Sequence, residues 1–219
     1  MDQADFTGPF EVLTRLPDAE FLVIASDRSP IRDAKGLILT PQIGFADTPK
    51  LDVLLVPGGS GVNALMEDEA TLSFVREQVA GAKLVLSVCT GALLLGATGF
   101  LQGRKTTTHW ASHHLLPLFG ATPVNERVVV DGNLVSTAGV TSGIDGALCA
   151  AAILCGEHAA KEIQLYLEYS PAPPFHSGSP ATAPTEVLEA VKASLQAVTE
   201  ERAAISCRVA SRLGTTPKK

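Results

Sequence analysis

Apolar and polar positions form alternating blocks along the chain, and these blocks predict strands separated by helices. Apolar runs that are short and rich in β-branched residues predict strands, because helices are longer and show a 3.6-residue period. The expected strands are Phe21–Ala25, Leu37–Thr40, Leu51–Val56, Leu84–Val88, Lys105–His109, Arg127–Val130 and Leu134–Thr137. Asp131-Gly132 lies between the last two runs and predicts a tight hairpin there.

Helical spacing of apolar residues predicts helices in the segments between the strands. One helix should span about residues 68–80, with Asp68 as its N-cap and with Leu72, Val75 and Val79 on one face. Another opens at Thr90 in an Ala/Leu-rich segment. The remaining expected helices are Ser112–Leu118, Gly143–Cys155, Ala159–Tyr169 and about Pro184–Val209, with an extended proline-rich segment over Ser170–Pro180.

The alternation of strands and helices predicts an α/β fold, with a mostly parallel sheet covered by helices on both faces. Functional sites in such sheets form beyond the carboxyl ends of the strands. Three conspicuous segments fall at these ends: Gly58-Gly59, Cys89 and the loop Gly139–Gly143. Their convergence at one edge of the sheet predicts a site there.

Composition limits the class of protein. With 219 residues, 46% hydrophobic and 18% charged, the chain fits a single domain over residues 1–219. Within it we expect a core of about residues 1–170, the proline-rich segment 170–184 and a C-terminal helix of about 184–209. A net charge of −6 without a basic run argues against nucleic-acid and membrane partners. Four cysteines without CxxC spacing, and no apolar bilayer-spanning segment, are typical of a cytoplasmic protein.

Cys89 stands where a predicted strand runs directly into a predicted helix. A side chain at such a turn lies beside the free N–H groups of the first helical turn, whose partial positive charge stabilises a thiolate. Hydrolases present a nucleophilic serine on the same kind of elbow. The alternative is that Cys89 is a small core residue, since free cysteine is among the most buried residue types.

Several motifs together resemble the DJ-1/PfpI superfamily and, within it, the isonitrile (isocyanide) hydratases. The superfamily motifs are Pro57-Gly-Gly, Ser87-Val-Cys-Thr-Gly91, Thr107-Thr-His-Trp110, the Asp131-Gly-Asn hairpin and Gly139-Val-Thr-Ser-Gly-Ile-Asp145. Two further segments narrow the match to the hydratases: Asp5-Phe-Thr-Gly-Pro-Phe-Glu-Val12, and Leu167-Glu-Tyr-Ser-Pro-Ala-Pro-Pro-Phe175 with Gly178-Ser-Pro180. The resemblance extends from about Asp5 to Arg212 and implies a flavodoxin-like three-layer sandwich.

The resemblance assigns roles to individual residues. It places the nucleophile at Cys89 and an acid that hydrogen-bonds the thiol at Asp5. PfpI-type proteases have a histidine directly after the cysteine, where this chain has Thr90, so a Cys-His peptidase mechanism lacks its general base. The family fold begins with a buried strand before the acidic loop, yet only four residues precede Asp5. We therefore expect the first strand to be absent from this chain, through a late start assignment or a truncation.

The implied reaction converts an isocyanide into an N-substituted formamide through a thioimidate on Cys89, with no metal or other cofactor. One carboxyl group, Asp5, can serve both proton transfers. Thr90 is the third candidate catalytic residue, and the N–H groups of Gly59 and Thr90 are candidates for holding developing charge. The expected substrate-binding residues are Gly59, Gly139, Val140 and Thr141. We expect a homodimer that binds only a small-molecule isocyanide.

Other interpretations remain open at this point. Asp5 could instead cap a helix that Pro9 begins, and His109 and Trp110 are interpreted as structural residues at the end of a strand. A different class of function is a ligand- or redox-sensing domain, because similar modules form the N-terminal half of AraC-type regulators. Those regulators need a helix-turn-helix region of about a hundred residues, which this chain does not offer after its last expected helix.

Overall fold

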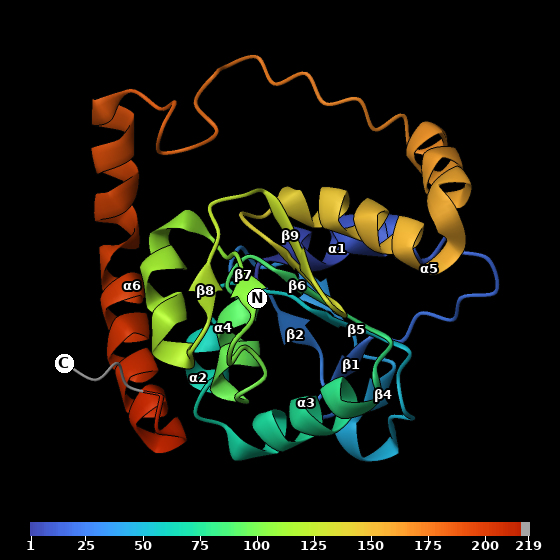
Figure 1. The fold of residues 1–219 in the computed structure, drawn as a ribbon, viewed down its shortest axis with the longest axis horizontal. Coiled ribbons are helices and arrows are strands. Elements are labelled where there is room, and N and C mark those ends of the chain that lie inside the picture. Colours follow the sequence, from blue (N-terminus) through green and yellow to red (C-terminus); the bar gives the residue numbers. More distant parts are fainter. Residues whose placement is uncertain (216–219) are drawn as a thin grey trace.

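A computed structural model describes residues 1–215 and shows a central sheet of four strands in the order β5-β6-β10-β9 (Figure 1). Strands β5 (Val53–Val56), β6 (Leu84–Val88) and β10 (Leu134–Thr137) are parallel, and β9 (Val128–Asp131) is antiparallel to β10. This is the mostly parallel, flavodoxin-like α/β arrangement expected from the sequence. All five residues of β6 are buried, because helices cover both of its faces.

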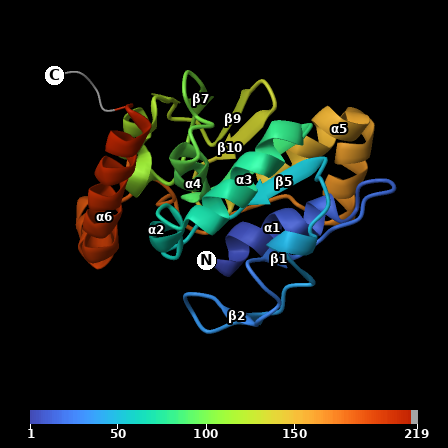
Figure 2. The ribbon, with the colours of Figure 1, turned by 90° about the horizontal axis from the view of Figure 1, so that it is seen from below.

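Two helical layers sandwich the sheet (Figure 2). Helix α1 (Gln3–Leu13) and the first part of α5 (Ser142–Tyr166) pack on one face. The other face carries α2 (Val62–Leu65), α3 (Glu69–Gly81) and α4 (Gly91–Ala97). The 3₁₀ helix η2 (Trp110–Phe119) and the long α6 (Thr185–Leu213) pack outside them. Two separate hydrophobic cores, one for each face, hold the three layers together.

Short strand pairs lie outside the central sheet. These are β1 (Ile24–Ala25) with β4 (Ile43–Gly44), β2 (Ile31–Arg32) with β3 (Ile38–Leu39), and β7 (Lys105–Thr106) with β8 (Thr122–Pro123). A single 3₁₀ turn, η1 (Phe45–Asp47), leads toward β5. No strand precedes α1 within residues 1–215, and β5 lies at an edge of the four-stranded sheet.

Elements with strong local signals form where the sequence predicts them. Asp68 caps α3 through a side-chain oxygen that accepts a hydrogen bond from Thr71 N at 3.0 Å. Strands β9 and β10 form the expected hairpin, and Gly132 in its turn has φ +61°, a left-handed conformation that favours glycine. The buried strand β6 and the helix that follows Thr90 are also confirmed.

Several predicted boundaries are wrong. The strand expected over residues 21–25 is reduced to β1, and the strand expected over residues 105–109 ends at Thr106. His109 is instead the N-cap of η2, where Nδ1 accepts a hydrogen bond from Ala111 N at 3.3 Å. The first helix does not begin at Pro9: Asp2 caps α1, and Pro9 lies inside it.

After the last strand, β10, the chain consists of α5, a long segment without regular structure, and α6. Gly156, with φ +87°, interrupts α5 close to the expected break between two helices. Residues 168–184, here called the strap, carry no regular element and lead from α5 to α6 (Figure 1). Helix α6 packs against η2 and α4. Residues 216–219 of the predicted 1–219 domain lie outside the described residues.

Candidate active site

Cys89 forms the turn between β6 and α4. Its φ is +55°, a left-handed conformation that costs a residue with a side chain about 1–2 kcal/mol. The carbonyl oxygen of Cys89 accepts a hydrogen bond from Thr108 Oγ1 at 2.6 Å, and the whole residue is only 6% exposed. Backbone strain of this kind is typical of functional turns, since the surrounding packing must maintain it. The structure thus places Cys89 on the elbow that the sequence predicts.

Asp5 lies in the first turn of α1 and is fully buried. Its Oδ2 accepts a hydrogen bond from Gly58 N at 2.9 Å, while Oδ1 has no hydrogen-bond partner among the described residues. Gly58 has no room for a side chain, because a Cβ atom there would lie 2.5 Å from Thr90 N and 2.8 Å from Asp5 Oδ2. The start of α1, the end of β5 and the elbow therefore converge at one point.

Thr90 connects the elbow to the glycine loop. Its Oγ1 accepts a hydrogen bond from Gly59 N at 2.9 Å and is 3.2 Å from Gly59 O, to which it can donate. Gly59 has φ +111°, a conformation open mainly to glycine. The N–H of Gly59 is therefore engaged with Thr90, and the expectation that this group is free to hold developing charge does not match the geometry.

The electrostatics of the site couple Asp5 to Cys89. Burial, and then the negative charge of Asp2, raise the pKa of Asp5 to about 6. Burial, and then the charge of Asp5, raise the pKa of the Cys89 thiol, against opposing contributions from the Thr90 N–H and from Arg202. The thiolate stabilisation expected from the helix terminus is thus outweighed. The resting site holds a thiol beside a carboxyl group that titrates near neutral pH.

The loop after β10, residues 138–141, approaches the site with some of its residues and not with others. A Cβ atom on Gly139 would lie 3.6 Å from His109 Cδ2, and Val140 packs against the hydrophobic core that includes Cys89. Thr141 is exposed, and its Oγ1 accepts a hydrogen bond from Arg127 at 3.2 Å. The structure therefore brings Gly139 and Val140 toward the elbow and places the Thr141 side chain at the surface.

Three polar residues near the elbow were not assigned to the site from the sequence. Thr108 binds the Cys89 carbonyl, as described above. His109 is partly buried, and burial lowers its pKa, with Arg202 acting in the same direction. Arg202 comes from α6 and is only 5% exposed. The motif Thr107-Thr-His-Trp110 carried a signal for the first two, whereas Arg202 lies in a polar helix without any recognisable motif.

The described part of the chain contains neither a cluster of metal ligands nor a membrane-spanning helix. Within residues 1–215 no group of three or more His, Cys, Asp or Glu side chains is arranged to hold a metal ion. No helix in the same part of the chain is long and apolar enough to cross a membrane. All four cysteines are free thiols.

The fold and the site together define a three-layer α/β protein with a cysteine at a strand-to-helix elbow and a buried carboxyl group beside it. The model of the DJ-1/PfpI family matches residues 1–152, and the chain belongs to this family. The resemblance inferred from the motifs is therefore confirmed.

Individual relatives extend the match beyond the family model. The chain is 51% identical over 213 residues to an isonitrile hydratase from Pseudomonas putida, covering 97% of this chain and 93% of that protein. The crystal structure of a ThiJ/PfpI family protein from Pseudomonas syringae matches with a TM-score of 0.91 at 38% identity, covering 94% of this chain and 86% of that one. Drosophila melanogaster DJ-1beta matches with a TM-score of 0.67 at 23% identity over 77% of this chain and 92% of its own, which shows the fold alone.

Proposed function

We propose that this protein is an isonitrile hydratase, an enzyme that adds water to an isocyanide to give the N-substituted formamide. The observation that carries the proposal is the pairing of two side chains. The Cys89 thiol stands on a strained elbow, and beside it lies the buried carboxyl group of Asp5, whose pKa is about 6. The 51% identity to the Pseudomonas putida isonitrile hydratase over nearly the whole chain supports the same reaction. Isocyanides of small organic groups are the proposed substrate class.

The first half of the proposed reaction makes a covalent intermediate. The Asp5 carboxylate takes the Cys89 thiol proton as the sulfur attacks the terminal carbon of the isocyanide, which forms the C–S bond. Asp5 then gives that proton to the same carbon, and the product is a thioimidate with its C=N bond intact. Because Asp5 Oδ1 is not committed to another hydrogen bond in the described residues, it can exchange the proton while Oδ2 stays bound to Gly58.

Water completes the reaction. Asp5, again a carboxylate, removes a proton from water as the oxygen adds to the thioimidate carbon, and it passes this proton to the nitrogen. The C–S bond of the tetrahedral adduct then breaks, Asp5 carries the hydroxyl proton to the departing Cys89 sulfur, and the hydroxyl oxygen becomes the formyl oxygen. No electrons are gained or lost overall, so the cycle needs no cofactor in this proposal. Thr90 contributes its N–H to the sulfur and its hydroxyl to the position of the Gly59 loop.

Substrate contacts and assembly complete the proposal. Gly59, Gly139 and Val140 border the elbow and are proposed to contact the isocyanide, while Thr141 would act through its bond to Arg127. We also propose a homodimer, because large apolar side chains are exposed on α5 and the strap. A cytoplasmic location is supported by the four free thiols, and the net charge of −6 supports the absence of nucleic-acid and membrane partners.

The test is formamide production from a simple aryl isocyanide, followed by chromatography. We expect turnover by the unchanged protein and none by Cys89→Ala. The variant should stay folded, since Ala fits the same backbone turn. Cys207→Ala, which changes an exposed cysteine on α6, is the matched control and should keep full activity. Residual turnover above a few per cent in Cys89→Ala contradicts the covalent mechanism. Binding of isocyanides without formamide formation supports the sensing function instead.

A further inference from the structure

Arg202 is a buried arginine on α6 that makes only neutral hydrogen bonds. Its Nε donates to Asn63 Oδ1 at 2.9 Å, and one terminal nitrogen donates to Ser112 Oγ at 3.0 Å. Both partners are themselves buried, at 3% and 0% exposed. Within residues 1–215 no carboxylate lies within salt-bridge distance of the Arg202 guanidinium. The positive charge is therefore held in the interior without a direct counter-ion.

A charge in this state calls for an explanation, because burying an unpaired ion is costly. Arg208, six residues further along α6, shows the ordinary alternative: it is exposed and forms a two-point ion pair with Glu67, at 2.9 and 2.7 Å. A purely structural contact between α6 and η2 could be made by an apolar side chain. The network around Arg202 instead fixes a guanidinium in place, which indicates that the charge itself is used.

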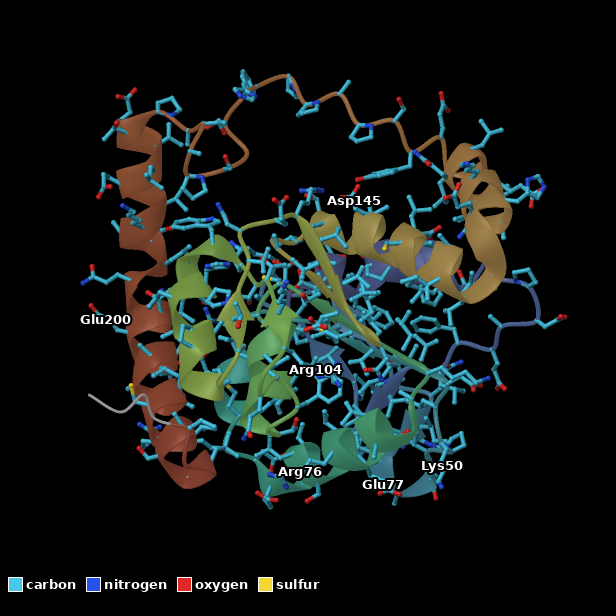
Figure 3. The ribbon with its side chains drawn as sticks, viewed as in Figure 1. Lys50, Arg76, Glu77, Arg104, Asp145 and Glu200 are labelled. Atoms are coloured by element: carbon cyan, nitrogen blue, oxygen red, sulfur yellow. The ribbon has the colours of Figure 1, made fainter. Side chains whose placement is uncertain are left out.

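The position of Arg202 connects α6 to the candidate site. Asn63 lies on α2, directly after the glycine loop, and Ser112 lies on η2, three residues after His109. Glu200 points outward from α6 in Figure 3, and Arg202, two residues later on a helix of 3.6 residues per turn, lies on the opposite, inward side. Helix α6 lies entirely outside residues 1–152 that match the family model.

The charged and titratable groups around Arg202 act on one another. Asp5 on α1 and Arg202 on α6 act on Cys89 in opposite directions, and the charge of Arg202 opposes the rise in the pKa of the Cys89 thiol caused first by burial and then by Asp5. Burial, and then the charge of Arg202, lower the pKa of His109 at the start of η2. Glu201 accepts a hydrogen bond from Asn63 Nδ2 at 2.6 Å, which places Asn63 between Glu201 and the Arg202 guanidinium.

We propose that Arg202 is a positioning residue of the Cys89 site, the fixed positive charge by which the C-terminal helix stabilises the thiolate form of Cys89. Asn63 and Ser112 hold the guanidinium so that it offsets the negative charge of Asp5 at the sulfur. Transfer of the thiol proton to Asp5 then neutralises the carboxylate, and the positive charge of Arg202 stabilises the thiolate that remains. This inference rests on the proposed function for its role in catalysis, although the effect on the thiol is independent of any substrate.

The experiment measures the rate of Cys89 alkylation by iodoacetamide as a function of pH, with peptide mass mapping and no isocyanide present. We expect Arg202→Met to slow alkylation of Cys89 by about tenfold at each pH from 7 to 9, because a rise of one unit in the pKa of the thiol lowers the thiolate fraction tenfold. Arg202→Lys keeps the charge and should stay within about threefold of the unchanged protein. Arg208→Met, which removes a charge from the exposed side of the same helix, should leave the profile unchanged.

Each result decides the proposal. An unchanged rate of Cys89 alkylation in folded Arg202→Met overturns it and assigns Arg202 a purely structural role. If Arg202→Met fails to fold, Arg202→Gln replaces it, because its neutral amide removes the charge and can still donate hydrogen bonds to Asn63 Oδ1 and Ser112 Oγ; an unchanged alkylation rate there overturns the proposal equally. Failure of the proposed function is a separate result, since it appears as absent formamide from the unchanged protein whatever the alkylation profile shows.

Discussion

At the scale of single residues, Asp5 shows how a candidate active site opposes stability. Its pKa is raised from 3.8 to about 6, first by burial and then by Asp2. The folded state therefore prefers the protonated acid more strongly than the unfolded chain does. The stabilisation from this preference is complete below about pH 3.8 and is lost as the pH rises through about 6. Above that range the buried carboxylate is a net cost to the fold.

Asp5→Asn should therefore abolish hydration and, at pH 8, raise the thermal midpoint. The shift in pKa corresponds to a stability gain of about 3 kcal/mol, which should largely disappear by about pH 4, where the wild-type acid is protonated too. Thermal unfolding of both proteins from pH 4 to pH 8, with formamide production at pH 7, checks this. Asp47→Asn, at an exposed position, serves as the control. An active Asp5→Asn variant would exclude Asp5 as the proton donor.

The candidate site could be predicted from the sequence only in part. Cys89 was identifiable because an apolar strand runs into a helix at that residue, and Asp5 because its motif resembles the hydratases. The capping role considered for Asp5 is wrong, since Asp2 accepts the hydrogen bond from Ala4 N at 3.1 Å. Arg202 had no local signal, because its role depends on a packing contact between residues about 140 positions apart, as in its bond to Asn63.

At the scale of elements, local rules succeeded where a side chain or turn marks a boundary. Asp68 marks the start of α3, and Asp131-Gly132 marks the β9–β10 hairpin. They failed where tertiary contacts override propensity. Pro9 suggested a helix start, yet α1 continues through it because its buried face packs against α5. The strand expected to reach His109 ends at Thr106, where the short pairing of β7 with β8 ends.

The contact between α4 and β5 yields a prediction about Gly91. A Cβ atom on Gly91 would overlap the carbonyl oxygen of Val56, so Gly91→Ala must push the start of α4, and with it the elbow, away from β5. Although alanine favours helices, we expect a loss of about 1–3 kcal/mol and much reduced turnover. Gly81→Ala at the end of α3 has open space and should be neutral or stabilising by up to about 1 kcal/mol. Thermal unfolding and rate measurements on both variants test this, and a fully active Gly91→Ala would contradict it.

At the scale of the whole molecule, the strap is anchored at its start and exposed beyond. Tyr169 donates a hydrogen bond from its hydroxyl to Asp145 Oδ1 at 3.2 Å, and the other oxygen of Asp145 binds Arg127. Figure 3 shows Asp145 on the side of α5 that faces the strap. This small network joins the strap to the loop that carries Thr141. At its other end the strap continues into α6, the helix that carries Arg202.

The exposed apolar side chains at the end of α5 and in the strap yield the last prediction, a homodimer. Leu165, Tyr166 and Phe175 are 81%, 75% and 78% exposed, and large apolar groups gain free energy when a partner covers them. A second copy of the chain that covers them would remove these apolar groups from water, which favours association. Sedimentation at micromolar concentration should show a dimer, and Leu165→Glu with Phe175→Glu should shift it to monomer without lowering the content of helix. Ile38→Glu, on the β2–β3 pair, changes a similarly apolar exposed residue and should leave the dimer intact. A monomeric unchanged protein, or a double variant that remains dimeric, would show that this surface is not the interface.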